Sequence, residues 1–339
     1  MKLFAQDEKS GTTTLSELVR IYGELSPPTF FGCYAYATQS GFRAFELAMG
    51  DDFWSSTTSH WLFGIDYGRT DPRALREIAD RQNADIRIYD GAWVVKQDGF
   101  MPRRDFHAKL AIMEDAEAPA CGIVLGSGNF SFNGLRRSVE AGTAIIASAK
   151  EEIEERTDPL KNAFEILWNN STPLQTIISD YEDRRAALLS KSDAMKPKKV
   201  PKAANMFWIE AGYVTKNRGK HAPGNQIFFP KGFRGFFGFP NKANEQKNSV
   251  IGSVTFATKI GPDVTNDLRL NRNSMEKISL PIPETHGFGV YDGKVLVFER
   301  RGGKFFMSAF ESAEFELVFS HRLVAIKRMN GGRRYGEIV

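Results

Sequence analysis

Along the first 150 residues, segments whose apolar residues follow the helical period alternate with segments whose apolar residues follow the pattern of strands. Apolar residues every three to four positions predict helices at 14–25, 40–53 and 71–82. Between and after them lie runs that are apolar throughout or at alternate positions, which predict strands at 29–38, 60–68, 84–91, 106–114, 121–129 and 140–148. Strands that alternate with helices are typical of an α/β fold, so we expect a mostly parallel sheet flanked by helices.

The pattern changes in the second half of the chain. A charged helical region is expected from about 150 to 190, broken near 169–174. The segment 190–205 contains two prolines, five lysines and almost no bulky apolar residue, which predicts a solvated linker. Short apolar runs punctuated by turn residues follow, with hairpin signals at YDGK and RGGK; these runs are 228–239, 249–261, 287–310 and 313–329.

We therefore expect two domains. The first, 1–190, is an α/β sheet flanked by helices, and the second, 206–339, is an all-β barrel or pseudobarrel. Residues 191–205 are expected to form the linker between them.

Composition excludes several classes of protein. With 42% hydrophobic residues the chain can build real cores, so disorder is not expected. No stretch approaches the eighteen or so apolar residues that a membrane-spanning helix needs, and the N-terminus lacks a hydrophobic signal core, so we expect a cytoplasmic protein without membrane contact. Only Cys33 and Cys121 are present, and both are expected to be small core residues rather than metal or disulfide partners.

The basic charge is confined to the second half. Residues 1–200 contain 24 basic and 29 acidic side chains, whereas residues 201–339 contain 21 and 12. A basic module joined to an acidic one indicates that the second half binds a polyanion. An ordinary basic surface is the alternative.

Two predicted strands, 106–114 and 121–129, contain a few polar residues although their other residues predict buried strands. His107 and Lys109 are two residues apart, so on a strand 106–114 they share one face. The opposite face then holds Phe106, Ala108, Leu110 and Ile112. On the next strand Ser127 and Asn129 obey the same period, and the glycines at 126 and 128 let an anion approach the backbone. We expect the four polar side chains to converge.

Such a cluster suits phosphoryl chemistry. A lysine and an asparagine amide bind the non-bridging oxygens of a phosphate, a serine adds a hydroxyl, and a neutral imidazole can attack phosphorus. The attack needs a partner on the second ring nitrogen, and Glu140 is the carboxylate we assign to that role. Taken singly, the histidine could be structural and Gly-Ser-Gly-Asn a turn; the combination favours a site.

The residues His107-Ala108-Lys109, Gly126-Ser127-Gly128-Asn129 and Glu140 resemble the signature of the phospholipase D superfamily, H-x-K followed by G-S-x-N and a later glutamate. The resemblance implies a phosphodiesterase that needs no metal or cofactor and works through a covalent phosphohistidine, with His107 as nucleophile. Two departures stand out: Glu114 replaces the family's aspartate, and the spacer 114–120 is longer. Neither Glu114 nor Asp115 is given a catalytic role.

The superfamily's active site contains two such motifs, and this chain has one. Its five histidines stand at 60, 107, 221, 286 and 321, and only His107 lies in an H-x-K. The resemblance therefore implies a two-fold homodimer in which His107, Lys109 and Asn129 of both copies form one site. One imidazole would attack while the other protonates the leaving oxygen.

The runs 207–239 and 267–283 resemble the C-terminal domain of NgoFVII-type, BfiI-like restriction endonucleases. These join a phospholipase D-like nuclease to a DNA-reading pseudobarrel of the kind found in plant B-three transcription factors. Arg and Asn in two predicted loops could read base edges of double-stranded DNA, while Lys216, Lys220 and Lys231 would contact phosphates. The candidate DNA-binding residues are Lys216, Asn217, Arg218, Lys220, Arg269, Asn271, Arg272 and Asn273. Phe233, Phe236 and Phe237 are expected in the core.

The sequence thus predicts a sequence-specific, metal-independent restriction endonuclease, as used in restriction-modification and phage defence beside a cognate methyltransferase. The chain lacks G-x-x-x-x-G-K-[ST], so an ATP-driven helicase subunit would have to be a separate protein. Two alternatives remain: a phosphodiesterase acting on phospholipid or another substrate, and a DNA-binding protein whose nuclease half is an inert scaffold.

Overall fold

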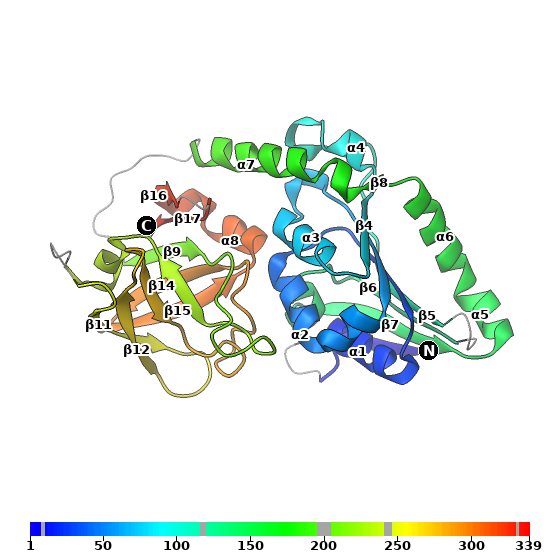
Figure 1. Cartoon of the computed structure of the whole chain (residues 1–339), viewed down its shortest axis with the longest axis horizontal. Coiled ribbons are helices and arrows are strands. Elements are labelled where there is room, and N and C mark those ends of the chain that lie inside the picture. Colours follow the sequence, from blue (N-terminus) through cyan, green and yellow to red (C-terminus); the bar gives the residue numbers. More distant parts are fainter. Residues whose placement is uncertain (8–10, 116–119, 195–204, 241–245, 330–331) are drawn as a thin grey trace. The chain divides into compact units, whose positions relative to one another are not determined.

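A computed structural model describes residues 1–7, 11–115, 120–194, 205–240, 246–329 and 332–339. The chain divides into two compact units, Met1–Lys191 and Ser192–Val339, called here the N-unit and the C-unit (Figure 1). Each unit contains one sheet, so the chain is a mixed α/β protein with two sheets. Of the expected linker, 191–194 continue a helix and 195–204 lie outside the described residues.

The N-unit contains an eight-stranded sheet. Its strands are β1 (Lys2–Gln6), β2 (Thr29–Tyr34), β3 (Thr58–Phe63), β4 (Ala84–Ile88), β5 (Lys109–Asp115), β6 (Ala120–Gly126), β7 (Glu140–Ala147) and β8 (Thr172–Pro173). Their order in the sheet is β1-β7-β6-β5-β2-β3-β4-β8.

The expectation of a mostly parallel sheet was wrong. Only β2–β3 and β3–β4 are parallel, and the other neighbouring pairs are antiparallel. A parallel connection needs a crossover of a dozen or more residues, usually a helix. Such helices follow β2 and β3, but β5, β6 and β7 follow one another without a crossover helix and pair antiparallel.

Helices cover both faces of this sheet (Figure 1). They are α1 (Thr14–Leu25), α2 (Gln39–Ser56), α3 (Pro72–Ala79), α4 (Gly91–Val94), α5 (Lys150–Arg156), α6 (Asp158–Asn169) and α7 (Ile178–Ala194). The three helices expected before residue 83 are present, and the charged region 150–190 is divided among α5, α6 and α7. Side chains of Thr13, Thr38 and Asp71 cap the first three helices.

The two faces of β5 differ as the period of two requires. Phe106, Ala108, Leu110 and Ile112 all belong to one apolar cluster with Phe164 of α6, which confirms their shared face. Since side chains alternate along a strand, Lys109 projects from the other face. The buried free thiols Cys33 and Cys121 also lie in this cluster, as expected of small core residues.

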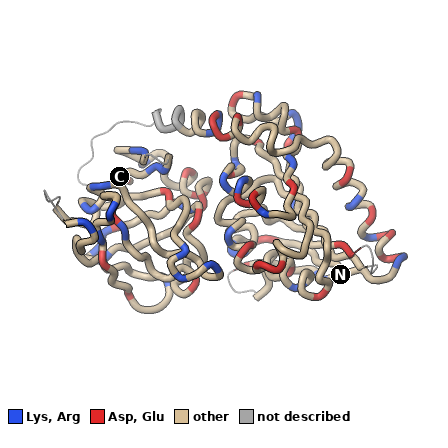
Figure 2. The backbone as a smooth tube through the Cα atoms, viewed as in Figure 1, with Lys and Arg blue, Asp and Glu red and all other residues tan. Residues whose placement is uncertain are grey.

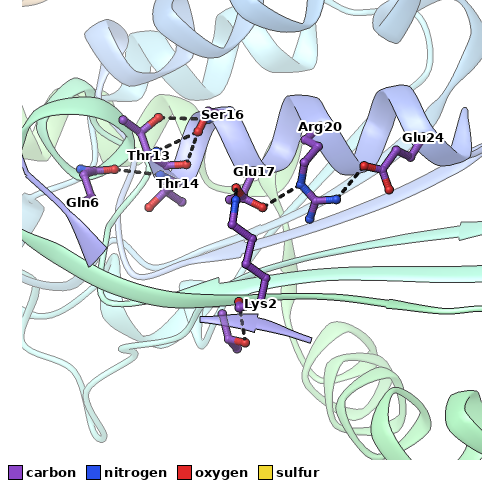
Figure 3. A network of polar contacts seen from close by, with 9 residues as sticks. Lys2, Gln6, Thr13, Thr14, Ser16, Glu17, Arg20 and Glu24 are labelled. Atoms are coloured by element: carbon purple, nitrogen blue, oxygen red, sulfur yellow. Dashed lines mark hydrogen bonds and ion pairs between the residues drawn. The ribbon is translucent and has the colours of Figure 1, made fainter. Parts of the chain in front are cut away.

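A charged network fastens the edge strand β1 to α1 (Figure 3). The carboxylate of Glu17, 2% exposed, accepts hydrogen bonds from Lys2 of β1 and from Arg20, which also bonds Glu24. The side-chain carbonyl of Gln6 accepts from the backbone N–H of Thr14 at 2.8 Å. Burial raises the pKa of Glu17, but the two cationic partners outweigh it and hold this pKa below its ordinary value.

The C-unit contains a nine-stranded sheet, and among its described residues after 204 the α-helix is α8 (Ser312–Phe319). Its strands are β9 (Met206–Glu210), β10 (Gln226–Phe229), β11 (Val250–Ala257), β12 (Val264–Leu270), β13 (Glu276–Ser279), β14 (Val295–Arg301), β15 (Lys304–Phe310), β16 (Leu323–Arg328) and β17 (Arg334–Ile338). Their order is β10-β13-β12-β11-β15-β14-β9-β17-β16.

Two local expectations for the C-unit need correction. The run 313–329 was expected to be a strand, but its first residues form α8, in which Phe315 and Phe319 are buried one helical turn apart. RGGK does connect the hairpin β14–β15, with Gly302 and Gly303 both at positive φ. YDGK makes only a turn ahead of β14, from Lys294 N–H to the carbonyl of Tyr291.

The sheet of the C-unit curls back on itself. The guanidinium of Arg333 bonds the carbonyls of Ala211, just after β9, and Phe228 of β10, at 2.9 and 2.7 Å. A bridge pairs Thr215 with Gln226, the first residue of β10, although β9 and β10 are far apart in the sheet order. The curled sheet encloses an aromatic core, in which Phe233 and Phe237 are buried and Phe236 is partly buried, as expected.

We expect Glu17→Gln to lower the free energy of unfolding by about 1–2 kcal/mol at pH 7, because Lys2 and Arg20 lose their charged acceptor. The folded-state pKa of Glu17 is lowered, so its contribution is present above the unfolded pKa and disappears as pH falls through the folded pKa. Urea denaturation of the full chain at pH 7 and at pH 3 should show a deficit that shrinks in acid. Glu24→Gln, whose side chain is 51% exposed, is the control and should change little. A deficit independent of pH contradicts the ion-pair account.

Candidate active site

The motif residues gather at one end of β5, β6 and β7, called here the motif end of the sheet. Lys109 begins β5, Glu140 begins β7, and Ser127 directly follows β6. Because β6 runs antiparallel to both neighbours, the start of β5, the end of β6 and the start of β7 lie together. The sequence placed His107 inside a strand, but the regular strand begins two residues later.

His107 and Lys109 are in direct contact. The ammonium Nζ of Lys109 lies 3.3 Å from Nδ1 of the His107 imidazole and donates to the His107 backbone carbonyl at 2.8 Å. The imidazole is exposed and the lysine is half-buried. Burial lowers the pKa of Lys109, although the Glu140 carboxylate acts in the opposite direction.

This contact determines which ring nitrogen is ready to react. An ammonium only donates, so Nδ1 must accept and the proton of a neutral ring stands on Nε2. A nucleophilic Nε2 needs the other tautomer. In a working site Lys109 must therefore turn from Nδ1 to the phosphate, which exchanges a ring nitrogen for a charged oxygen acceptor.

Ser127 and Glu140 form the second contact pair. The Ser127 hydroxyl donates to Oε2 of Glu140 and accepts from the backbone N–H of Ala141 at 3.1 Å. The Ser127 N–H donates to the Ala141 carbonyl at 3.0 Å, so the hydroxyl replaces the second bond of this strand pair. A hydroxyl has one proton, and here it is used within the protein rather than offered to a phosphate.

The partner of Glu140 differs from the one expected. Its hydrogen bond goes to Ser127, and no hydrogen bond joins it to His107 within the described residues. The orienting role of Glu140 toward the imidazole stays a prediction. What the structure adds is an electrostatic interaction between Glu140 and Lys109.

Asn129 lies on the loop after β6 and has an unsatisfied acceptor. Its Oδ1 is buried without a hydrogen-bond partner among the described residues. No hydrogen bond there joins its side chain to His107, Lys109 or Glu140. A buried amide oxygen without a partner carries a desolvation cost; several other buried polar atoms of the described residues, such as Nε1 of Trp61 and of Trp208, also lack a partner.

Two glycines and one glutamine fix the backbone of this loop. A Cβ on Gly128 would lie 2.3 Å from the carbonyl oxygen of Gly134, and one on Gly134 would lie 2.4 Å from that of Asn129. The side-chain amide of the fully buried Gln6 donates to the Ser138 carbonyl at 3.0 Å and to that of Gly134 at 3.3 Å. Asn129 is thus presented from a tightly held turn.

The sequence missed Asp66, which holds the segment before His107. Its Oδ2 accepts from the backbone N–H of Phe106 at 2.9 Å, and its Oδ1 is buried without a partner among the described residues. Burial raises the pKa of Asp66, with the Phe106 N–H and His107 acting against it. The sequence signal that could have found it was an aspartate within the apolar run 60–68. Of this run, only the part up to Phe63 forms a strand.

Glu114, which stands where the phospholipase D signature has an aspartate, lies away from the motif end. Glu114 is five residues along β5 from Lys109, roughly 17 Å at about 3.3 Å per residue. It forms an ion pair with Lys161 of α6. That Glu114 has no catalytic role stays a prediction.

In the first candidate DNA-binding loop, several polar side chains bond to other residues of the C-unit. Asn217 donates to the Asn225 side chain at 2.8 Å and accepts from the Asn225 N–H at 3.2 Å. Arg218 pairs with Glu284 at 2.6 Å. Lys220 is exposed and Lys216 is half-exposed in the same loop.

The second candidate loop is a turn between β12 and β13. Asn271 donates to the Asn273 side chain at 3.2 Å, and that side chain also accepts from the Met275 N–H. Arg269 pairs with Asp267 at 3.0 Å, whereas Arg272 is exposed without a hydrogen bond or ion pair to another described residue.

These two loops do not lie together. Gln226 pairs with Ser279 and Phe229 with Glu276, so the first loop enters β10 at one end and the second enters β13 at the other. The separation along the strand pair is roughly 10 Å. The eight candidate residues therefore form two groups rather than one cluster.

Neither a metal site nor a membrane-spanning helix is found among the described residues. No group of three or more His, Cys, Asp or Glu residues is placed there to bind a metal ion. In the same part of the chain, no helix is both long enough and apolar enough to span a membrane.

No family model matches the chain, and no curated protein matches it. Among solved structures, it is similar to NucT from Helicobacter pylori at 15% identity and a TM-score of 0.36, over 51% of this chain and 97% of that one. It is similar to Nuc, a phospholipase D family member from Salmonella typhimurium, at 11% identity and a TM-score of 0.35 over the same shares. Yeast tyrosyl-DNA phosphodiesterase gives 10% identity and a TM-score of 0.27 over 70% and 59%. At these values the chemistry must be argued from the side chains of this chain.

Gly128→Ala should displace the Asn129 loop, because its Cβ would meet the rigid backbone oxygen of Gly134 at 2.3 Å. We expect a loss of about 1–3 kcal/mol of stability, which thermal unfolding measures.

The matched control is Gly23→Ala in α1, where an added Cβ meets nothing within 4 Å. This change should stabilise the protein by up to about 1 kcal/mol. If Gly128→Ala were as stable as the wild type, the tight contact between Gly128 and Gly134 would be ruled out.

Proposed function

We propose that this chain is a metal-independent phosphodiesterase that cleaves DNA through a covalent phosphohistidine. The main support is the exposed His107 imidazole with the Lys109 ammonium 3.3 Å away, at the sheet end where the unsatisfied amide of Asn129 also lies. An imidazole, an ammonium and an amide that can donate through Nδ2 are the groups that phosphoryl transfer needs, and we propose that Asn129 supplies the last of them.

The proposed reaction has two displacements. Nε2 of one His107 attacks phosphorus, forming a P–N bond as the P–O bond to the leaving sugar breaks, while a second imidazolium donates its proton to that oxygen. Water then attacks phosphorus and gives its proton to the second, now neutral, imidazole as the P–N bond breaks. Lys109 and Asn129 hold the non-bridging oxygens throughout.

The second imidazole is proposed to come from a second copy of the chain. Support comes from the single H-x-K and from an apolar side chain exposed beside the motif end. Val139, next to Glu140, is 84% exposed. Leu3, 75% exposed, lies three residues along β1 from Gln6, the residue that pairs with Glu140. Apolar surface beside an incomplete site suits a contact between two copies.

The finer proposal is a restriction endonuclease in which the C-unit, a pseudobarrel, reads double-stranded DNA. It is supported by the basic balance of residues 201–339 and by the exposed Lys220 and Arg272. Figure 2 shows basic segments in both units, mixed with acidic ones. Since the two candidate loops enter the β10–β13 pair at opposite ends, we propose that they contact separate parts of the recognition site. A cognate methyltransferase and a separate ATP-driven helicase subunit are the partners of this proposal.

We expect purified wild-type protein to cleave duplex DNA in EDTA, and His107→Ala to lose at least about 1,000-fold of that rate through loss of the nucleophile. The assay uses a random-sequence plasmid library, and mapping the ends reports specificity. Glu114→Gln, at the far end of β5, is the control and should keep its activity. Equal cleavage by wild type and His107→Ala would exclude this mechanism, and cleavage of phosphatidyl substrates alone would move the activity to lipids.

A heterodimer of one wild-type and one His107→Ala chain tests the shared site. With one composite site it retains one imidazole and lacks either nucleophile or acid, so we expect a loss of about 100-fold or more. Two tags with sequential affinity steps isolate the heterodimer for rate measurement. Two independent sites would instead leave half of the wild-type rate.

A further inference from the structure

Two exposed aromatic side chains flank the segment that leads into His107. Tyr67, in the turn after β3, is 40% exposed, and Trp93 of α4 is 42% exposed. The Tyr67 hydroxyl donates to Asp105, two residues before His107, at 2.7 Å. Trp93 lies under the guanidinium of Arg103, whose Cζ is 4.9 Å from the ring centroid. Both rings are thus attached to residues 103–105, and we call this surface the aromatic platform.

The backbone around the platform is conformationally strained. Tyr67, Asp90 and Phe100 are non-glycine residues with φ of 57°, 48° and 57°. A bulky residue in this region costs free energy and persists only where its surroundings hold it. The hydrogen bond to Asp105 holds Tyr67, and a two-pronged ion pair from Arg103 holds Asp90. The fold thus keeps these turns in place at a cost, beside the reactive histidine.

The cations of the platform suit a polyanion. Cζ of Arg69 lies 5.4 Å from the Tyr67 ring centroid, and Arg104 follows Arg103 on the segment that leads to His107. Arg69 and Arg104 are exposed, and neither side chain has an ion pair or hydrogen bond with another described residue. A ring beside a free guanidinium offers a stacking surface for a base and a charge for the adjoining phosphate.

A membrane surface fits the platform less well. Surfaces that insert into a bilayer place apolar side chains at the tip, whereas the loop between Trp93 and Phe100 ends in Lys-Gln-Asp-Gly. Asp98 in that tip is fully exposed. A tip made of charged and polar residues opposes insertion into a bilayer.

We propose that the aromatic platform stacks the unpaired bases of a nucleic acid strand next to the phosphate that His107 attacks. The proposal rests on the proposed function and deepens it: the strand enters the N-unit single-stranded or locally opened. Tyr67 and Trp93 provide ring faces, and Arg69 and Arg104 contact the flanking phosphates.

The test separates binding of bases from catalysis. In a His107→Ala background, which removes cleavage, fluorescence anisotropy measures binding of a fluorescein-labelled oligo-dT and of the same oligonucleotide with abasic positions. Stacking predicts a preference for oligo-dT, and Trp93→Ala should weaken its binding roughly tenfold while leaving abasic binding unchanged. Tyr67→Leu should act alike, and Tyr67→Phe, which keeps the ring but loses its hydrogen bond to Asp105, should retain more of the binding than Tyr67→Leu.

Phe306→Ala is the matched control. Phe306 of β15 is 43% exposed and lies under Arg301 at 5.1 Å, the same type of pair in the C-unit. It should leave oligo-dT binding unchanged. An equal loss in Phe306→Ala, or no preference for oligo-dT over the abasic strand, overturns the proposal.

Two further measurements keep the outcomes distinct. With His107 intact, the wild-type protein should hydrolyse methyl 4-nitrophenyl phosphate, which has no base; if it does not, the catalytic proposal fails while the binding result still tests the platform. Sedimentation with phosphatidylglycerol vesicles tests the lipid alternative. Vesicle binding that Trp93→Ala abolishes, without any effect on oligo-dT, assigns the platform to a membrane and overturns the proposal.

Discussion

The hairpin order of β5, β6 and β7 is the constraint on which the candidate site depends. Antiparallel neighbours alternate in direction, so the start of β5, the end of β6 and the start of β7 lie at one end of the sheet. Lys109, Ser127 and Glu140 occupy these three positions. Residues separated by more than thirty positions in the chain thereby become neighbours, and His107 and Asn129 follow from their places beside them. A parallel arrangement of the same strands would not place the ends together.

The local features of the sequence were predicted well, and the long-range ones less so. The helices before residue 83 and the apolar face of β5 follow from period and capping, which are properties of a few neighbouring residues. The wrong expectation of a mostly parallel sheet came from extending the helix–strand alternation of residues 29–91 to strands that lack crossover helices. Helix α8 was missed because a short apolar run does not distinguish a strand from a buried helix.

Within the site, motif and spacing identified the residues but not their partners. The spacing His107-x-Lys109 correctly predicted a contact between the two side chains. It did not predict that the Ser127 hydroxyl would be used by Glu140 and Ala141, because this depends on where the β6–β7 pairing ends. Asp66 was missed for a similar reason: its bond to the Phe106 N–H joins segments forty residues apart. The pairing of Asn217 with Asn225 likewise needed the folded loop.

The position of β1 has a consequence for the order of folding. This strand is synthesised before the other strands of its sheet, yet its partner is β7, where Gln6 pairs with Glu140, and the Gln6 amide also holds the turn beyond Asn129. More than 130 further residues must therefore be synthesised before β1 can pair with β7. Closing so long a loop slows folding. A nascent chain that ends before β7 has no complete motif end, so the candidate site is a property of the finished N-unit and not of any fragment that contains H-x-K.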